Sequence, residues 1–165
     1  MRDNSDYMTI DGKLYRKNVG IIVFNDNKKV LFCKRLNSKT GNWQFPQGGV
    51  DIGETEEIAA LRELAEETGI TSAQIIYTDE KLYKYDFPED IRKSKKYYED
   101  VTGQIQKWFL IKFTGNDNEI KIPSDEFEDY IWTSLSLSLT EKVIQFKQEV
   151  YKEVITKFLN ILNSK

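Results

Sequence analysis

The chain of 165 residues contains no histidine, one cysteine and three prolines. Without histidine it can have no Ser-His-Asp triad, no histidine general base and no histidine-ligated zinc. The single cysteine, Cys33, excludes an internal disulfide and a cysteine-rich metal site. Because Cys33 follows the apolar run Val30-Leu31-Phe32, we expect it to be buried. Carboxylates, lysine, arginine and tyrosine remain as the main groups for chemistry.

Long hydrophobic runs are also missing. The longest apolar stretch lies near residues 19–24, which is far too short to span a membrane. The polar start of the chain lacks the apolar centre of a signal peptide, so we expect a soluble, cytoplasmic protein with no membrane partner. The net charge of −3 argues against a protein that coats nucleic acid by bulk charge. A nucleotide or an RNA end would need a bound cation to offset the repulsion.

The remaining composition is that of a folded domain. Hydrophobic residues make up 39% and aromatic residues 13% of the chain, which is enough for a core, and the length fits one domain over residues 1–165. Residue patterns predict strands at 18–24, 29–34, 43–45, 106–114, 119–122 and 129–133, and a strand or bent hairpin arm at 75–86.

Helices are expected at residues 56–68 and 141–162, where apolar residues recur at helical spacing. Residues 1–14 are expected to form a loose leader with a short strand at 7–10, and residues 87–104 a charged loop. The order of elements predicts an α+β fold, with helices packed on one mixed sheet.

The helix expected at 56–68 has an acidic side. At about 100° per residue, Glu63, Glu66 and Glu67 fall within one arc. The opposite side should carry the apolar residues Ile58, Leu61, Leu64 and Ala65, and the small residues Ala59 and Ala60 should leave room beside the acidic arc. Like charges at this spacing weaken a helix by a few tenths of a kcal/mol per pair. The cluster therefore indicates either a hard cation such as Mg²⁺ or a solvated acidic surface.

The segment around this helix resembles the motif of the Nudix hydrolases. That motif fixes glycines, glutamates and an arginine at set spacings, with two aliphatic positions; here they are Gly48, Glu54, Arg62, Glu63, Leu64, Glu66, Glu67, Gly69 and Ile70. The resemblance implies an α/β/α sandwich around a mixed sheet. It also implies Mg²⁺-dependent hydrolysis of a diphosphate linked to another group, with Mn²⁺ or another divalent cation able to substitute.

Further segments resemble the branch of this family that contains the bacterial RNA pyrophosphohydrolases and dinucleoside polyphosphate hydrolases. They lie at residues 15–20, 43–49, 103–109, 126–132 and 146–151. The resemblance implies a catalytic, metal-binding set of Glu63, Glu66, Glu67 and Glu126, with Gly48 among the metal ligands. It implies that the substrate is bound by Arg16, Arg35, Gln47, Gln104, Phe146 and Lys147.

In this set Arg16, Arg35 and Lys147 would meet phosphates, and Phe146 would stack on the terminal base. Core packing remains the alternative for Phe146, and a solvated charge the alternative for Arg35. With no histidine available, Glu63 or Glu126 would accept a proton from water.

The implied reaction removes pyrophosphate from the 5′-triphosphate end of RNA, and diadenosine polyphosphates are a second substrate class. The alternatives are a dinucleoside polyphosphate hydrolase without an RNA role, an inactive binding module, and a helix that binds Ca²⁺ for structure only. We expect a monomer and leave a protein activator open. The lysines of the 87–104 loop, Lys93, Lys95 and Lys96, are interpreted as solvated rather than as an RNA contact.

Overall fold

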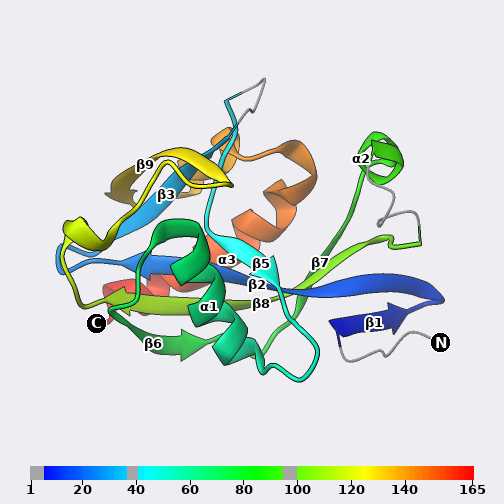
Figure 1. Ribbon diagram of the computed structural model, residues 1–165, viewed down its shortest axis with the longest axis horizontal. Coiled ribbons are helices and arrows are strands. Elements are labelled where there is room, and N and C mark those ends of the chain that lie inside the picture. The colour runs from blue at the N-terminus through cyan, green and yellow to red at the C-terminus, as the bar shows by residue number, and fades with distance from the viewer. Residues whose placement is uncertain (1–5, 37–40, 95–99) are drawn as a thin grey trace.

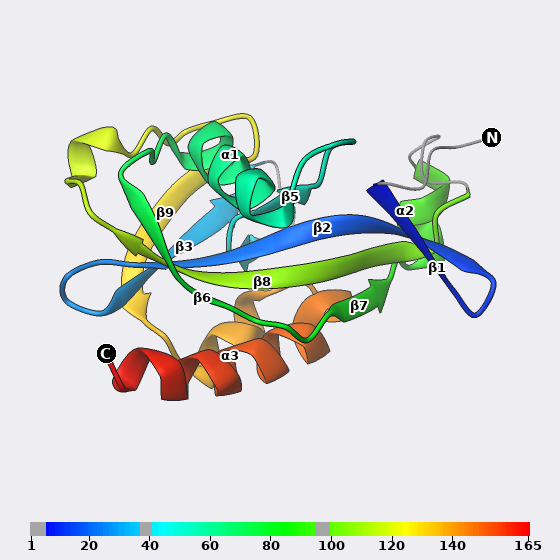
Figure 2. The same cartoon turned by 90° about the horizontal axis from the view of Figure 1, so that it is seen from below.

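The computed structural model describes residues 6–36, 41–94 and 100–165, and within them a mixed sheet lies between helices (Figure 1). The strands run β4–β3–β2–β8–β6 along the main path, while β1 and β5 also pair with β2, β7 with β8, and β9 with β3. At the centre, β2 (Lys13–Phe24) and β8 (Gly103–Phe113) are parallel. Helix α1 covers one side of the sheet and α3 the other (Figure 2). The predicted α/β/α sandwich is confirmed.

The other strands are short. They are β1 (Tyr7–Ile10), β3 (Lys29–Arg35), β4 (Trp43–Gln44), β5 (Gln47–Gly49), β6 (Ala73–Thr78), β7 (Tyr83–Asp86) and β9 (Phe127–Ser134). The α-helices are α1 (Glu56–Thr68), α2 (Glu89–Ser94) and α3 (Gln148–Asn163), and the 3₁₀ turns are η3 (Asp117–Glu119), η4 (Leu137–Lys142) and η5 (Gln145–Lys147). No helix among the described residues is long and apolar enough to cross a membrane.

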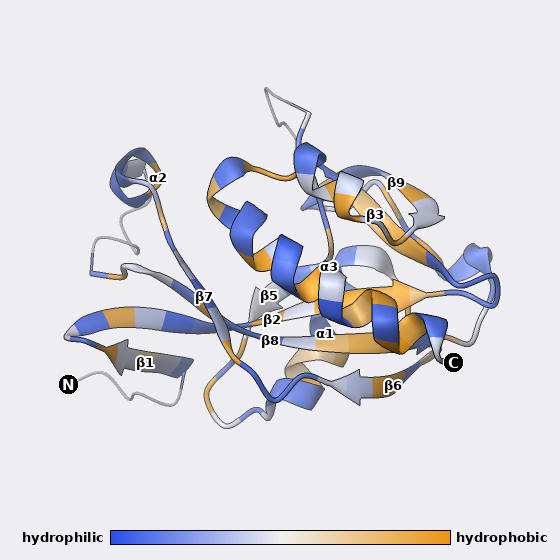
Figure 3. Cartoon of the chain, turned by 180° about the vertical axis from the view of Figure 1, so that it is seen from behind, coloured by the Kyte–Doolittle hydropathy of each residue, from blue (hydrophilic) through white to orange (hydrophobic). Residues whose placement is uncertain are grey.

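Successive residues of β2 point to opposite faces of the sheet and so supply two cores. Ile21 packs in the cluster beneath α1, and Ile22 in the cluster beneath α3. On α3, Val154 and Phe158 are fully buried against the sheet, and apolar and polar residues alternate along the helix (Figure 3). Cys33 is buried in the α1 cluster, as expected.

Helix α1 has the predicted bounds because both of its ends are capped. The hydroxyl of Thr55 accepts the N–H of Ile58 at 3.2 Å, and Gly69 ends the helix at φ 81°, a left-handed conformation that favours glycine. The predicted orientation of the apolar side is wrong. Ile58 is 58% exposed, whereas Ala59 and Ala60 are fully buried.

The physical reason is close packing of α1 on the sheet. Alanine side chains let the helix approach β2, so the larger Ile58 and Leu61 are turned outward. The alanines therefore do not leave space for a ligand beside the acidic arc. They bring the acidic arc down to the sheet instead.

Further expectations about the elements are wrong. The expected short strand at 7–10 is confirmed as β1, but the next strand begins at Lys13 and pairs with β1 through a turn at Asp11 and Gly12. Residues 7–14 are therefore a hairpin of the sheet and not a loose leader. Residues 119–122 are not a strand. There the carboxylate of Glu119 accepts the backbone N–H groups of Thr71 and Ser72, which holds the segment in the turn η3.

The last helix starts at Gln148 and not at Glu141, because the extended residue Val143 separates two 3₁₀ turns that precede it. The expected hairpin arm at 75–86 is two strands, β6 and β7, both antiparallel to β8. The expected loop at 87–104 contains α2 and the start of β8. Lys95 and Lys96 lie outside the described residues.

Candidate active site

Arg62 ties the acidic side of α1 to the loop in front of the helix. Its guanidinium donates to Glu54 Oε2 at 2.7 Å, to the carbonyl oxygen of Gly49 at 2.8 Å, to Glu63 Oε1 at 2.9 Å and to Glu66 Oε2 at 3.2 Å. The hydrogen bond from Arg62 lowers the pKa of Glu54. The guanidinium of Arg62 thus holds the carboxylates of Glu54, Glu63 and Glu66 and the backbone at Gly49 in fixed positions.

Glu67, near the end of α1, is only 7% exposed. Its carboxylate accepts the backbone N–H of Gln47 at 3.2 Å. Burial, and then the nearby charges of Glu63 and Glu126, raise the pKa of Glu67 well above its usual value, while Lys147 opposes the rise. Burial also raises the pKa of Glu63. Carboxylates held together in this way cost free energy, and a bound cation would offset that cost.

The expected acidic residues line one pocket of about 170 Å³. Glu63, Glu66 and Glu67 come from α1, and Ser124, Asp125 and Glu126 come from the loop before β9. Gly48 lies directly beside them, because a Cβ at this position would collide with the carboxyl group of Glu63. The fold therefore brings the segment 124–126 to the acidic side of α1, although more than fifty residues separate them in the sequence.

The residues of this pocket suit a hard divalent cation. Their donors are carboxylate oxygens, which Mg²⁺ prefers, and one of the carboxylates is buried. Across residues 6–36, 41–94 and 100–165, no three acidic or cysteine side chains already converge as a finished metal site. Glu63 and Glu66 are held by ion pairs to Arg62. Donor type and burial fit the cation, and small side-chain rotations would be needed to complete its ligand set.

Two cations meet at Gln44 of β4, and one of them, Lys147, is near enough to Glu67 to act on its pKa. Lys147, in the turn η5, is only 4% exposed. Its ammonium group donates to Gln44 Oε1 at 3.1 Å and to Gln47 Oε1 at 3.3 Å. The guanidinium of Arg35 donates to the same oxygen of Gln44 at 3.0 Å. Gln47 joins the two halves of the site, since its backbone contacts Glu67 and its side chain contacts Lys147.

Behind Gln47 lies a row of neutral amides. Gln47 Nε2 donates to Gln104 Oε1 at 3.4 Å, and Gln106 Nε2 donates to Gln47 Oε1 at 3.4 Å. The hydroxyl of Tyr85 also donates to Gln104. The structure thus places the expected Gln47 and Gln104 side by side, and it adds Gln106, which sequence reasoning missed. No signal in the sequence marked Gln106, because its complete burial in β8, a strand that also carries Gln104 and Lys107, is visible only in the fold.

Arg16 of β2 lies against Gly49, where any side chain would collide with its guanidinium. Within the described parts of the chain, the Nε of Arg16 is buried and has no hydrogen-bond partner. A buried donor without an acceptor is uncommon. An anionic ligand at this end of β5 would supply the missing acceptor.

Phe146 packs on aromatic neighbours and also borders a pocket. Its ring packs on Tyr85 at 5.5 Å and on Phe87 at 6.3 Å between centroids. It is only partly buried, and it lines a pocket of about 580 Å³ between α2 and η5, together with Pro88, Asp90, Ile91, Ile144, Gln145 and Glu149. One part of the ring is therefore core, and another part borders a space large enough for a base.

Comparison with known proteins shows the family of this chain. The model of the NUDIX domain matches residues 14–154. The chain belongs to the Nudix family.

Curated Nudix relatives match along most of this chain. It is 42% identical to the RNA pyrophosphohydrolase of Pelagibacter ubique, over 90% of this chain and 94% of that protein. It is 39% identical to the RNA pyrophosphohydrolase of Caulobacter vibrioides, over 90% of this chain and 88% of that protein. It is 44% identical to the chloroplastic Nudix hydrolase 26 of Arabidopsis thaliana, over 90% of this chain and 71% of the relative.

Solved structures show the same Nudix fold at lower sequence identity. The E. coli dihydroneopterin triphosphate pyrophosphohydrolase matches with a TM-score of 0.69 and 21% identity, over 86% of this chain and 93% of that one. A C. elegans Ap4A hydrolase in a binary complex matches with a TM-score of 0.61 and 21% identity, over 90% of this chain and 99% of that one.

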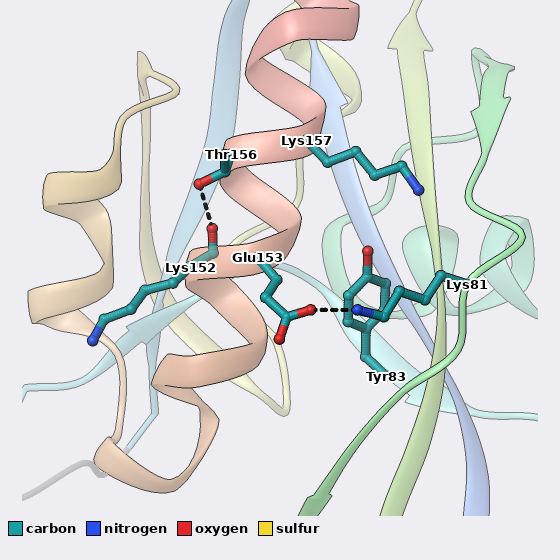
Figure 4. A pocket seen from close by; sticks show the side chains of 6 residues that line it. All are labelled: Lys81, Tyr83, Lys152, Glu153, Thr156 and Lys157. Atoms are coloured by element: carbon teal, nitrogen blue, oxygen red, sulfur yellow. Dashed lines mark hydrogen bonds and ion pairs between the residues drawn. The ribbon is translucent and has the colours of Figure 1, made fainter.

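A third pocket of this Nudix protein, of about 520 Å³, lies between α3 and the segment that joins β6 to β7 (Figure 4). It is lined by Lys81, Tyr83, Lys152, Glu153, Thr156 and Lys157. Each of its lysines already has an acidic partner, in the pairs Lys81–Glu153, Lys152–Glu149 and Lys157–Asp79. Because these charges are balanced, the pocket is a poor phosphate site, and the candidate active site remains the acidic pocket beside Arg35 and Lys147.

Proposed function

We propose that this Nudix protein removes pyrophosphate from the 5′-triphosphate end of RNA with the help of Mg²⁺. One observation carries the proposal: Gln47 contacts Glu67 of the acidic pocket through its backbone N–H, and it contacts the ammonium group of Lys147 through its side chain. A polyphosphate chain needs both kinds of group, because divalent cations and basic side chains share its negative charge. Relatives named RNA pyrophosphohydrolase match this chain over almost their whole length, which favours RNA as the substrate.

The metal ligands in this proposal are the four carboxylates of the pocket, together with Gly48 of β5. A divalent cation supplies electrophilic stabilisation at phosphoryl oxygens and makes water more acidic. Mn²⁺ would substitute for Mg²⁺, since both accept oxygen ligands.

The protein's own groups would divide the remaining work. Arg62 keeps Glu63 and Glu66 in place. Lys147 and Arg35 stabilise the charge that develops on the phosphoryl oxygens, and Arg16 binds the phosphate chain at the other end of β5. With no histidine in the chain, a carboxylate, Glu63 or Glu126, accepts the proton from the attacking water.

On the base side, Phe146 would stack on the terminal nucleotide and Gln104 would lie near it. The pocket beside Phe146 gives the base a place outside the acidic region. The described residues of one chain supply every group named here, so we also propose that the protein acts as a monomer, which its elution volume in gel filtration would test.

The test is product analysis with Mg²⁺. The proposal predicts that 5′-triphosphorylated RNA yields pyrophosphate and 5′-monophosphorylated RNA, while 5′-monophosphorylated RNA gives no product. Diadenosine tetraphosphate at equal concentration should react more slowly. Cleavage of diadenosine tetraphosphate without any reaction on RNA would support the dinucleoside polyphosphate alternative, and no reaction on either would support an inactive binding module.

A further inference from the structure

We infer that Gln44 is a positioning residue, whose neutral amide oxygen holds the cations of Arg35 and Lys147 side by side without cancelling their charge. The inference deepens the proposed function and rests on it, since it takes these two cations to be phosphate-binding groups. The observation behind it is a shared acceptor: both cations donate to the same Oε1 of Gln44, at 3.0 and 3.1 Å.

The position of this oxygen is fixed by the segment that carries it. Gln44 is 3% exposed, and β4 pairs with β3 so that Gln44 lies opposite Cys33. The next residue, Phe45, donates its backbone N–H to the hydroxyl of Tyr151 at 3.0 Å, and its ring stacks on the Tyr151 ring. The amide of Gln44 therefore sits on a rigid support, and it can impose its geometry on two long, flexible side chains.

The chemical type of the acceptor matters as much as its position. Two like charges that share one neighbour repel each other, and the usual buried partner for them would be a carboxylate. A carboxylate would orient the pair equally well, but its charge would compete with a phosphate for the same donors. Gln44 provides the hydrogen bonds and adds no negative charge of its own. Gln47, the other acceptor for Lys147, is also a neutral amide.

Two substitutions separate orientation from charge. Gln44→Met removes the hydrogen-bond acceptor and keeps the side-chain volume. Because the two cations then lose their alignment, kcat/KM for 5′-triphosphorylated RNA should fall by about tenfold to hundredfold. Gln44→Glu keeps an acceptor, so the protein should stay folded with an unchanged or raised melting temperature, while its affinity for pyrophosphate in the presence of Mg²⁺ falls. Gln74→Met makes the same chemical change at an exposed position of β6 and should leave kcat/KM unchanged.

A double-mutant cycle shows whether Gln44 acts through Lys147. If it does, the factor lost on Gln44→Met should shrink in a Lys147→Met background. An undiminished factor there, or wild-type pyrophosphate affinity in Gln44→Glu, would overturn the inference.

Pyrophosphate binding also keeps this inference separate from the proposed reaction. A protein that hydrolyses neither RNA nor diadenosine tetraphosphate, yet loses pyrophosphate affinity in Gln44→Glu and Lys147→Met, would refute the proposed function and support the role of Gln44. If the wild type processes RNA and Gln44→Glu binds pyrophosphate as tightly as the wild type does, the proposed function would be supported and the role of Gln44 refuted. Absence of pyrophosphate binding by the wild type would count against the role of Gln44.

Discussion

Among single residues, Glu67 shows most clearly how the site is biased toward a cation. The carboxylate is buried beside Glu63 and Glu126 and receives only one backbone hydrogen bond among its described contacts. In the metal-free protein this arrangement works against folding. The same arrangement favours binding of a divalent cation, which would neutralise the repulsion.

Glu67→Gln should therefore change stability and activity in opposite directions. We expect the metal-free variant to be more stable than the wild type by roughly 1–2 kcal/mol, because a buried charge becomes a neutral amide. Turnover should fall by several orders of magnitude, because the amide is a weak ligand for Mg²⁺. Urea denaturation with and without Mg²⁺ measures the first effect, and loss of stability in the metal-free variant would contradict it.

Phe146→Ala tests the base side of the site. Loss of base stacking is worth about 1–3 kcal/mol, so KM for an RNA substrate should rise by roughly 5- to 150-fold, while pyrophosphate affinity stays unchanged. Leu137→Ala, an exposed apolar residue of the nearby turn η4, is the matched control. Equal effects on RNA and on pyrophosphate would show that Phe146 serves only the core.

The spacing of Glu63, Glu66 and Glu67 made the acidic cluster predictable, because helical geometry alone places them together. Glu126, Arg35 and Lys147 could be suspected only through the resemblance to Nudix proteins, since no local pattern joins residues so far apart. Gln44 and Gln106 were missed as functional residues. A buried neutral amide leaves no periodic trace in a sequence, and its role depends on partners that only the fold brings near.

Among the helices and strands, the prediction that differs most from the structure concerns which side of α1 faces the sheet. The sequence pattern grouped Ile58 and Leu61 with Leu64 on the apolar side, but only Leu64 of these three is buried, together with Ala59 and Ala60. Close approach of the helix to the sheet decided the outcome. It also brings Glu67 into the buried region.

Ala60→Leu tests this packing directly. A larger side chain at this fully buried position should destabilise the protein by about 1–3 kcal/mol through overpacking. Leu61→Ala, next to it and 40% exposed, should change stability much less. Thermal unfolding of both variants gives the comparison, and a larger loss for Leu61→Ala would mean that the helix faces the other way.

The start of α3 was predicted one to two turns too early for a related reason. Apolar spacing continues through residues 143–147, yet this stretch is extended and 3₁₀. Periodicity records which residues are buried, and it does not distinguish a helix from a tight series of turns. These turns direct Lys147 to Gln44 and place Phe146 beside Tyr85.

For the molecule as a whole, an ion pair between the buried Asp79 and the partly exposed Lys157 connects the segment between β6 and β7 to the helix α3. Asp79 is fully buried, and its carboxylate accepts from Lys157 at 2.6 Å and from the hydroxyl of Tyr83 at 2.7 Å. Burial alone would raise the pKa of Asp79, but these hydrogen bonds outweigh it and lower the pKa below the ordinary value of 3.8.

Asp79→Asn should cost about 1.5–3 kcal/mol of stability, because the variant loses the charge-assisted hydrogen bonds that Asp79 accepts from Lys157 and Tyr83. Since the folded pKa lies below the unfolded value, the contribution of Asp79 is fully present above that ordinary value and is lost as the pH falls through the folded pKa. The difference in the free energy of unfolding between the wild type and Asp79→Asn should therefore become smaller at acidic pH. Glu153→Gln, which breaks the exposed pair with Lys81, should cost at most about 1 kcal/mol. If the difference in the free energy of unfolding between the wild type and Asp79→Asn does not change with pH, the lowered pKa of Asp79 would be contradicted.

The layered architecture and the family were predictable from the sequence because a long motif and alternating strands agreed with each other. The pairing of β1 with β2, the insertion of α2 and the two-strand edge formed by β6 and β7 were not. Each depends on contacts with β2 or β8, and a local pattern cannot specify a distant partner.

The most direct test is a crystal structure of the protein with Mn²⁺ and a non-hydrolysable triphosphate nucleotide. We predict anomalous density for manganese among Glu63, Glu66, Glu67 and Glu126, with the phosphate chain reaching from there to Arg35 and Lys147. Manganese and phosphates bound elsewhere, with only water among these carboxylates, would contradict the assignment of the site.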